Sequence, residues 1–279
     1  MRLEFVKMNG AANDFVLIDG RVDPAPLTAG RIRFMCDRRR GIGADGLIVI
    51  RPPAEADAEA DFHMEYYNSD GFPAEMCGNG SRCAARFGAS LGLGAPEGGA
   101  VRVRLTTDSG SIDALVHGDT VRADMMDARD MRRDIPVRVA QLEKIVHFMI
   151  VGTRHAVLLV DEARDLTESD IIELGRTIRN DTAFGPVGAN VNFASVDEEG
   201  IVHLRTYEKG VEAETHACGT GSVASAVVLA HLGRLKSPAT VLQHSGDRLN
   251  VSFVLAPEGA KNVALEGPVA VNFVGWLEL

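Results

Sequence analysis

The sequence has few cysteines, no long hydrophobic run and no excess of positive charge. No segment approaches the roughly 18 apolar residues that a transmembrane helix needs, so we expect no membrane partner. The opening residues lack a basic segment followed by an apolar one, so we expect no secretory signal and a cytoplasmic protein. The net charge of −10 argues against a nucleic-acid partner, because binding phosphates requires a basic face.

Four cysteines occur in 279 residues, at positions 36, 77, 83 and 218. This number is too low for a disulfide framework, so we expect free thiols. No Cys-x-x-Cys pair occurs and no histidine pair follows at zinc-ligand spacing, so we expect no metal. Chemical reactivity then remains as a reason for some of these cysteines.

The length of the chain favours two domains of roughly 100–150 residues each. Short apolar runs bounded by Gly, Pro, Asp or Asn are typical of β-strands. Such runs cover residues 15–18, 47–50, 101–105, 112–116, 157–160, 191–195, 201–206, 249–255 and 269–274. Helices are predicted over residues 80–91, 168–180 and 221–235. The sequence therefore predicts an α+β fold that is rich in strands.

Two segments of the chain are alike. The sixteen residues from Cys77, CGNGSRCAARFGASLG, match those from Cys218, CGTGSVASAVVLAHLG, at eight positions. Similar pairs lie upstream in the same order, at offsets of 140 to 145 residues: Tyr67 and Tyr207, Gly43 and Gly188, Val16 and Leu158. Coincidence between Gly-rich segments would not keep both order and spacing. We interpret the repeat as the duplication of a whole domain.

The duplication predicts a domain boundary in the polar stretch 124–133. The N-terminal half, residues 1–123, carries Cys77, and the C-terminal half, residues 124–265, carries Cys218. The last predicted strand falls after the second half should be complete. We therefore expect residues 266–279 to return and complete the first half.

In each half a cysteine precedes Gly-x-Gly and a predicted helix. The free N–H groups of a first helical turn and the positive end of the helix dipole favour an anion, and glycines let the backbone come close to a ligand. Such a position should lower the thiol pKa below its free value of roughly 8.5. The N–H groups of residues 78–80 and 219–221 could also hold a carboxylate.

Two such cysteines on opposite faces of one carbon would act as a base and an acid. One thiolate would remove the α-proton, the other thiol would deliver a proton from the far side, and the configuration would be inverted. The alternatives for each cysteine are a buried structural thiol and a redox pair. A non-catalytic amino-acid-binding module has no use for a second matched cysteine. Cys36 and Cys83 have no repeated context, and we predict that they are packed core thiols.

Several motifs resemble those of the diaminopimelate epimerases. They are Lys7-Met-Asn-Gly-Ala-Ala-Asn13, Gly41-Ile-Gly-Ala-Asp45, Met76-Cys-Gly-Asn-Gly-Ser-Arg82, Gly188-Ala-Asn190-Val-Asn192 and Ala217-Cys-Gly-Thr-Gly221. Asn79 stands where the related proline racemases typically have histidine. The resemblance implies two similar domains, each a curved, mostly antiparallel sheet wrapped around a central helix. It also implies a cofactor-free inversion of LL-diaminopimelate to the meso form, in lysine and peptidoglycan synthesis.

The resemblance further implies roles for the residues at matching positions. Cys77 and Cys218 would be the acid–base pair, and Glu208 and His155 would tune proton transfer. The amino-acid substrate would be held by Asn13, Asn68, Gly78, Asn79, Asn190, Glu208, Lys209, Gly219 and Thr220. Taken alone, each asparagine could equally be a turn or cap residue. The oligomeric state stays open, a homodimer included.

The sequence departs from the family pattern in four places. Lys209 stands where the family usually has arginine, and it lacks the bidentate fork that suits a carboxylate. Thr153 replaces an expected asparagine, although the adjacent Arg154 offers a guanidinium. Asn9 stands where histidine is common, and the loop before Glu214 is one residue longer than usual. Two of these departures concern the end of the substrate that does not react, so a racemase of another amino acid is the alternative interpretation.

Overall fold

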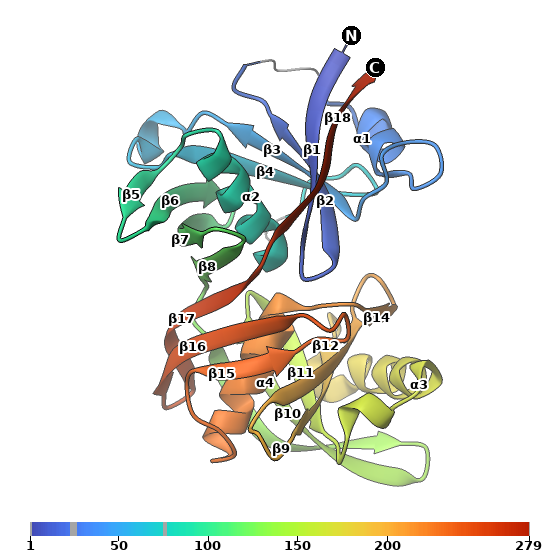
Figure 1. Ribbon diagram of the computed structural model, residues 1–279. Helices are drawn as coiled ribbons and strands as arrows, with labels where there is room; N and C mark the ends of the chain where they lie inside the picture. Colours follow the sequence, from blue (N-terminus) through green and yellow to red (C-terminus); the bar gives the residue numbers. More distant parts are fainter. Residues whose placement is uncertain (1, 23–26, 75–76, 279) are drawn as a thin grey trace. The chain divides into compact units, whose positions relative to one another are not determined.

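The computed structural model describes residues 2–22, 27–74 and 77–278. The chain divides into two compact units, Met1–Asp124 with Glu266–Leu279 as unit 1 and Met125–Leu265 as unit 2 (Figure 1). No helix among the described residues is long and apolar enough to cross a membrane.

Unit 1 is built on a sheet with a helix on either side. Its strands are β1 (Arg2–Gly10), β2 (Asn13–Asp19), β3 (Gly46–Arg51), β4 (Phe62–Asn68), β5 (Ala95–Glu97), β6 (Ala100–Thr107), β7 (Gly110–His117), β8 (Thr120–Asp124) and β18 (Ala270–Glu278). Its helices are α1 (Ala29–Cys36) and α2 (Gly78–Ser90), with a 3₁₀ turn at Glu55–Asp57. β18 pairs antiparallel with β1, so the end of the chain extends the sheet beside its own beginning (Figure 1).

Unit 2 repeats this plan. Its strands are β9 (Arg129–Val139), β10 (Leu142–Val151), β11 (Thr153–Leu159), β12 (Asn190–Val196), β13 (Val202–Glu208), β14 (Ala213–Thr215), β15 (Ala239–Leu242) and β16 (Arg248–Ala256). β17 (Gly259–Pro268) contains the end of unit 2 and the start of the return to unit 1. Its helices are α3 (Glu168–Arg179) and α4 (Gly219–His231), with 3₁₀ turns at Ala163–Asp165 and Thr182–Phe184.

The two units pair their strands in the same order. In unit 1, β1–β2 is antiparallel, β2–β3 parallel, β3–β4 antiparallel, β4–β6 parallel and β6–β7 antiparallel. In unit 2, β10–β11, β11–β12, β12–β13, β13–β15 and β15–β16 follow the same alternation. β9 pairs antiparallel with β10 as β18 does with β1. The repeated sequence thus corresponds to a repeated topology, and the predicted α+β class is confirmed.

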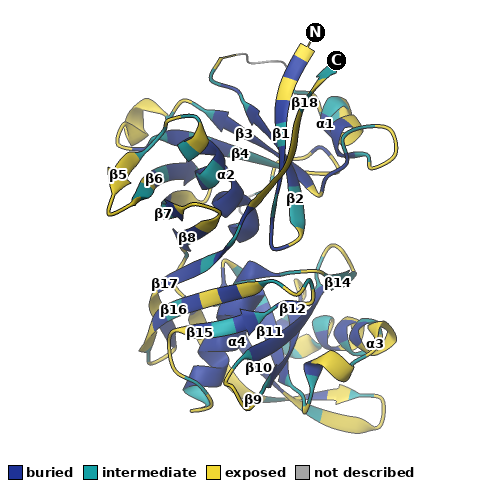
Figure 2. Ribbon diagram, viewed as in Figure 1, coloured by how far each residue is buried: buried dark blue, intermediate teal, exposed yellow. Residues whose placement is uncertain are grey.

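One helix in each unit is enclosed by the sheet. α2 packs against β1, β2, β6, β7 and β8, and α4 packs against β10, β11 and β16. Nearly every residue of α4 is buried because this helix is apolar on all sides (Figure 2). The second helix of each unit, α1 or α3, packs only one side onto the sheet through residues such as Ile32 and Ile171.

The helix ends have identifiable causes. α3 begins at Thr167, whose hydroxyl accepts the Asp170 N–H while the Asp170 carboxylate accepts the Thr167 N–H. This confirms the predicted start of that helix. α1 was not predicted: it has eight residues, of which only Ile32, Met35 and Cys36 are buried, so its apolar periodicity is too short to recognise.

A tight contact between α3 and the sheet gives a test of this packing. A Cβ atom at Gly175 would lie 2.5 Å from Cβ and Cγ of Tyr207, which is fully buried. Gly175→Ala should therefore lower the free energy of unfolding by about 1–3 kcal/mol, although alanine is intrinsically the better helix former. Urea unfolding would measure this change.

Gly30 in α1 is the matched control, because the nearest atom to its added Cβ is Thr28 Oγ1 at 3.9 Å. Gly30→Ala should leave stability unchanged or raise it by up to about 1 kcal/mol. Equal effects of the two substitutions would contradict the packing of α3 described here.

Candidate active site

Both repeated cysteines are the residue immediately before a central helix. Cys77 precedes α2 and Cys218 precedes α4, both helices of 13 residues, and both cysteines have extended backbones with φ of −135° and −131°. The hydroxyls of Ser81 and Ser222 donate to the carbonyls of Cys77 and Cys218 at 3.0 and 2.8 Å. The backbone therefore enters the two helices in the same way, and each cysteine lies at a helix N-terminus.

The Cys77 sulfur has partners of both kinds in unit 1. The Gly80 N–H donates to Sγ at 3.4 Å, and the thiol donates to Asn13 Oδ1 at 3.5 Å. A backbone N–H favours a thiolate, whereas a carbonyl oxygen favours a protonated thiol. Cys77 is therefore placed where both of its protonation states find a hydrogen bond.

The orientation of the Asn13 amide is fixed by a carboxylate. Asn13 Nδ2 donates to Asp45 Oδ2 at 2.7 Å, and since a carboxylate can only accept, Asn13 Oδ1 is left for Cys77. Arg38 holds Asp45 and Asp14 together, with contacts of 2.7 Å to each, and Lys7 also donates to Asp14. Burial raises the pKa of Asp14, but the hydrogen bonds from Arg38 and Lys7 outweigh it and lower the pKa to about 2.

The other residues predicted in unit 1 lie around the same helix end. Asn79 is buried and donates to Asn13 Oδ1 at 3.4 Å, and it accepts from Nη2 of the fully buried Arg82 at 2.9 Å. Gly78 is buried, and its carbonyl accepts from Arg82 at 3.2 Å. Asn68 is exposed at the end of β4 and accepts from the Tyr66 hydroxyl at 3.1 Å. Met76, which the sequence places in the first cysteine motif, is outside the described residues.

Cys218 in unit 2 has a different set of neighbours. Its backbone N–H donates to Gln243 Oε1 at 3.1 Å, and its sulfur lies 3.7 Å from Thr220 Oγ1. The backbone of Gly221 comes so close to the site that an added Cβ would lie 3.2 Å from Cys218 Sγ and 2.3 Å from Asn192 Oδ1. Only glycine fits there, whereas a Cβ at Gly80 in unit 1 would meet only side chains at 3.2 Å or more.

His155 is fully buried and neutral in unit 2. Because Asn192 Oδ1 accepts from Thr206, its Nδ2 group donates to His155 Nδ1 at 3.1 Å, and the imidazole proton must be on Nε2. Burial lowers the pKa of His155 to about 3, and the positive charge of Lys209 acts in the same direction. Nε2 has no partner among the described residues. His155 can thus donate a hydrogen bond but is uncharged at neutral pH.

Glu208, Lys209 and Asn190 lie together at the adjoining ends of β12 and β13. Asn190 Oδ1 accepts the Lys209 backbone N–H at 2.8 Å, and Glu208 Oε2 accepts from the Thr215 hydroxyl at 2.9 Å. Arg154 donates to the Phe184 carbonyl at 2.7 Å, so its guanidinium has a partner within unit 2. These side chains are therefore held by partners within unit 2.

The two remaining cysteines are core residues, as predicted. Cys83 and Cys36 are 0% and 4% exposed. Burial raises the pKa of Cys83 to about 12 and that of Cys36 to about 11. In the described part of the chain, no group of three or more His, Cys, Asp and Glu side chains is arranged to hold a metal ion.

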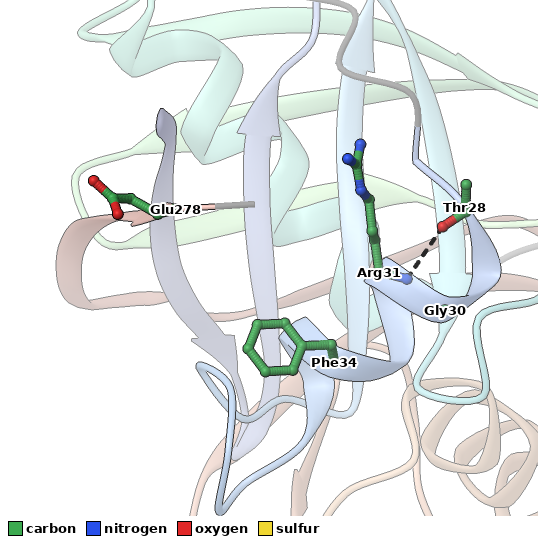
Figure 3. Close-up of a pocket in the computed structure, with 5 residues that line it drawn as sticks. All are labelled: Thr28, Gly30, Arg31, Phe34 and Glu278. Carbon is green, nitrogen blue, oxygen red and sulfur yellow. Dashed lines mark hydrogen bonds between the residues drawn. The ribbon is translucent and has the colours of Figure 1, made fainter. Parts of the chain in front are cut away.

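A surface pocket of about 420 Å³ lies beside α1 in unit 1 (Figure 3). It is shallow and is lined by Thr28, Gly30, Arg31, Phe34 and Glu278. None of these is a predicted site residue. We assign the pocket no part in the reaction.

Sequence reasoning missed three residues that hold the site together. Asp45 and Asn192 stand in recognised motifs, but a motif does not say which side chain they orient. Gln243 stands in no repeated segment. Its counterpart by strand register is Thr107, whose hydroxyl donates to the Gly110 carbonyl at 3.0 Å and accepts the Ser109 N–H at 3.1 Å. Only the folded chain brings Gln243 to Cys218.

The fold belongs to a class of two-domain proteins that includes amino-acid racemases and epimerases. The chain superposes on a probable proline racemase from Agrobacterium radiobacter with a TM-score of 0.75 and 16% identity, covering 99% of this chain and 93% of that one. A hydroxyproline epimerase from Agrobacterium vitis also gives 0.75, with 18% identity over 99% and 91% of the chains.

Proteins related in sequence identify one family within this class. The family model for diaminopimelate epimerase matches residues 5–130 and 148–262. The diaminopimelate epimerases of Gemmatimonas aurantiaca and Chlorobaculum tepidum are each 38% identical to the chain, covering 95% and 98% of it and 93% and 100% of their own lengths. The chain belongs to the diaminopimelate epimerase family, a family of isomerases, and the resemblance read from its motifs is confirmed.

The neutral state of His155 predicts a pH dependence of stability. With a folded pKa of about 3 against 6.5 unfolded, the unfolded chain takes up the proton first as pH falls. Stability from this residue is therefore present above pH 6.5 and is lost on acidification, by about 2 kcal/mol between pH 7 and pH 5.

His155→Gln should remove that loss, which urea unfolding of both proteins at the two pH values would measure. Parallel pH profiles for the wild type and the variant would show that His155 is not buried in its neutral form. His147, whose pKa burial also lowers, stays in both proteins and cancels in the comparison.

Proposed function

We propose that the chain catalyses the cofactor-independent inversion of LL-diaminopimelate to meso-diaminopimelate, with Cys77 and Cys218 as the two acid–base groups. The observation that carries the proposal is the pair of equivalent 13-residue helices, each preceded by a cysteine, in a member of this family. The enzyme acts in the cytoplasm, where thiols stay reduced.

The reacting carboxylate binds to backbone N–H groups at the starts of α2 and α4. The helix dipoles and the free N–H groups of Gly78, Asn79, Gly219 and Thr220 stabilise negative charge there. Negative charge grows on this carboxylate when the α-proton leaves, so the same groups bind the carbanion more strongly than the substrate. This is how the carbon acid becomes reactive without a cofactor.

The proton transfers involve two thiols in opposite states. One cysteine, as thiolate, takes the α-proton and becomes a thiol, and the other gives its proton to the opposite face and becomes a thiolate. The carbon is inverted, and the two cysteines have exchanged protonation states. Cys77, with Gly80 N–H and Asn13 Oδ1 beside its sulfur, is equipped for either state.

The polar side chains hold the zwitterionic ends of the substrate. Asparagine amides supply a donor and an acceptor together, which suits an ammonium beside a carboxylate. Asn13 and Asn68 contribute from unit 1, and Asn190, Glu208 and Lys209 contribute from unit 2. The lysine ammonium meets the distal carboxylate as a point charge rather than as a fork. Buried, neutral His155 supports this side of the site through its Nε2–H and does not exchange protons with the substrate.

Thr153 supports a second candidate, a racemase of another amino acid. By strand register Thr153 is the counterpart of Asn13, since Phe15 pairs with Gly46 as His155 pairs with Asn190. A hydroxyl offers one donor where an amide offers two. A substrate with a simpler distal end would need fewer polar partners at this position.

Deuterium exchange from solvent tests the reaction itself. Incubation of LL-diaminopimelate in D₂O without pyridoxal phosphate should yield meso-diaminopimelate that carries deuterium at the inverted α-carbon, detected by mass spectrometry and proton NMR. Exchange into proline, glutamate or another amino acid, with none into diaminopimelate, would establish the racemase instead. The absence of exchange from every amino acid tried would refute both.

Substitution of the cysteines tests the two-base mechanism. Cys77→Ala and Cys218→Ala should each lower turnover by a factor of about 10²–10⁴, because each removes one proton-transfer group. Cys83→Ala, which removes a buried thiol with a pKa of about 12, should keep most of the activity. Turnover would be followed as the formation of the meso isomer. Near-wild-type turnover in Cys218→Ala would rule out a paired acid and base.

A further inference from the structure

Gln243 closes a ring of hydrogen bonds around Cys218. Its side-chain carbonyl accepts the Cys218 N–H at 3.1 Å, and its amide group donates to Ser222 Oγ at 2.9 Å. Ser222 in turn donates to the Cys218 carbonyl at 2.8 Å. Each donor in the ring has one acceptor, and both backbone groups of Cys218 are held by this one side chain, directly or through Ser222.

The ring is buried, and backbone hydrogen bonds hold the turn that begins at Gln243. Gln243, Ser222 and Cys218 are 4%, 0% and 5% exposed, so water does not replace these bonds. Gln243 follows β15, and its backbone carbonyl accepts the Gly246 N–H at 3.0 Å in the turn to β16. In the same turn the Ser245 N–H donates to the His216 carbonyl at 2.9 Å. The turn therefore binds two backbone groups of the segment before α4, the His216 carbonyl and, through the Gln243 side chain, the Cys218 N–H.

Unit 1 differs from unit 2 at the position of Gln243. Ser81 donates to the Cys77 carbonyl as Ser222 does to that of Cys218, but Thr107, which stands in the position of Gln243, bonds to Gly110. The Cys77 sulfur accepts the Gly80 N–H and donates to Asn13, whose amide is oriented by its hydrogen bond to Asp45. The two halves thus fix their cysteines by different means.

We propose that Gln243 is a positioning residue that fixes Cys218 for proton transfer through its backbone. The proposal rests on the proposed function in taking Cys218 as an acid–base group. A buried side chain that only filled space would not need both of its amide atoms bonded to the residues that define one helix start.

The test uses Gln243→Met, which keeps the length and volume of the side chain but can neither accept from Cys218 nor donate to Ser222. Misplacement of a reacting group by about 1 Å costs on the order of a hundredfold, so kcat should fall by that order while KM stays within about threefold. Thr107→Val, the matched variant in unit 1, should change neither constant.

A second readout does not depend on the substrate. Alkylation of the two cysteines by iodoacetamide, followed for each peptide by mass spectrometry, uses Cys77 as a standard within the same molecule. Because one hydrogen bond shifts a local opening equilibrium by about fivefold, Gln243→Met should raise the Cys218 rate by about that factor and leave the Cys77 rate unchanged. A purely structural role would alter both rates together, or only the melting temperature.

Unchanged kcat with an unchanged ratio of alkylation rates would overturn the proposal. If Gln243→Met does not fold, Ser222→Ala serves in its place, because it removes the link between Gln243 and the Cys218 carbonyl and keeps the Gln243 acceptor for the Cys218 N–H. That variant should show a smaller change of kcat and of the alkylation ratio in the same direction. No change in either quantity would also overturn the proposal. If the wild type fails to invert any amino acid, the proposed function is lost, yet the alkylation ratio still decides whether Gln243 holds Cys218.

Discussion

The start of a buried helix fixes the position of each repeated cysteine. α2 and α4 are enclosed by their sheets, so they cannot slide, and the residue before each helix is held in the extended conformation where the first turn begins. A cysteine at this position has free N–H groups next to its sulfur whatever the side chains around it. The position of each repeated cysteine is therefore a property of the backbone, and it was duplicated together with the fold.

The side chains around the two helix starts have diverged while the backbone has not. Strand register and the helix starts give the equivalent positions: Asn13 and Thr153, Gly46 and Asn190, Asn68 and Glu208, Asn79 and Thr220, Cys77 and Cys218. Of these pairs only the cysteines remained identical. In the proposed reaction the chemistry at the reacting carbon is symmetric, since each thiol both gives and takes a proton, whereas the proposed substrate has two different ends. A symmetric scaffold with unlike polar residues suits both demands.

Local pattern was enough to predict three helices, half of the strands and the repeated cysteines. α2, α3 and α4 were predicted to within a few residues, because caps, glycines and apolar periodicity are local signals. The strands outside the predicted runs are β1, β4, β5, β8, β9, β10, β14, β15 and β17. β1 mixes Lys7 and Asn9 with its apolar residues, and β4 is half polar. The orientation of side chains could not be predicted from local pattern, for another reason. That Asp45 turns Asn13 or that Gln243 reaches Cys218 depends on contacts 32 and 25 residues apart in the chain.

The residues near the thiols keep one charge state across neutral pH. Asp14, with a pKa of about 2, stays ionised, and His155, with a pKa of about 3, stays neutral. The core thiols Cys36 and Cys83, at about 11 and 12, stay protonated. The contacts to Cys218 from Gln243 and Thr220 involve no ionisable group. Because none of these named groups titrates between about pH 5 and pH 9, the hydrogen bonds that Asp14 and His155 make keep the same form across that range.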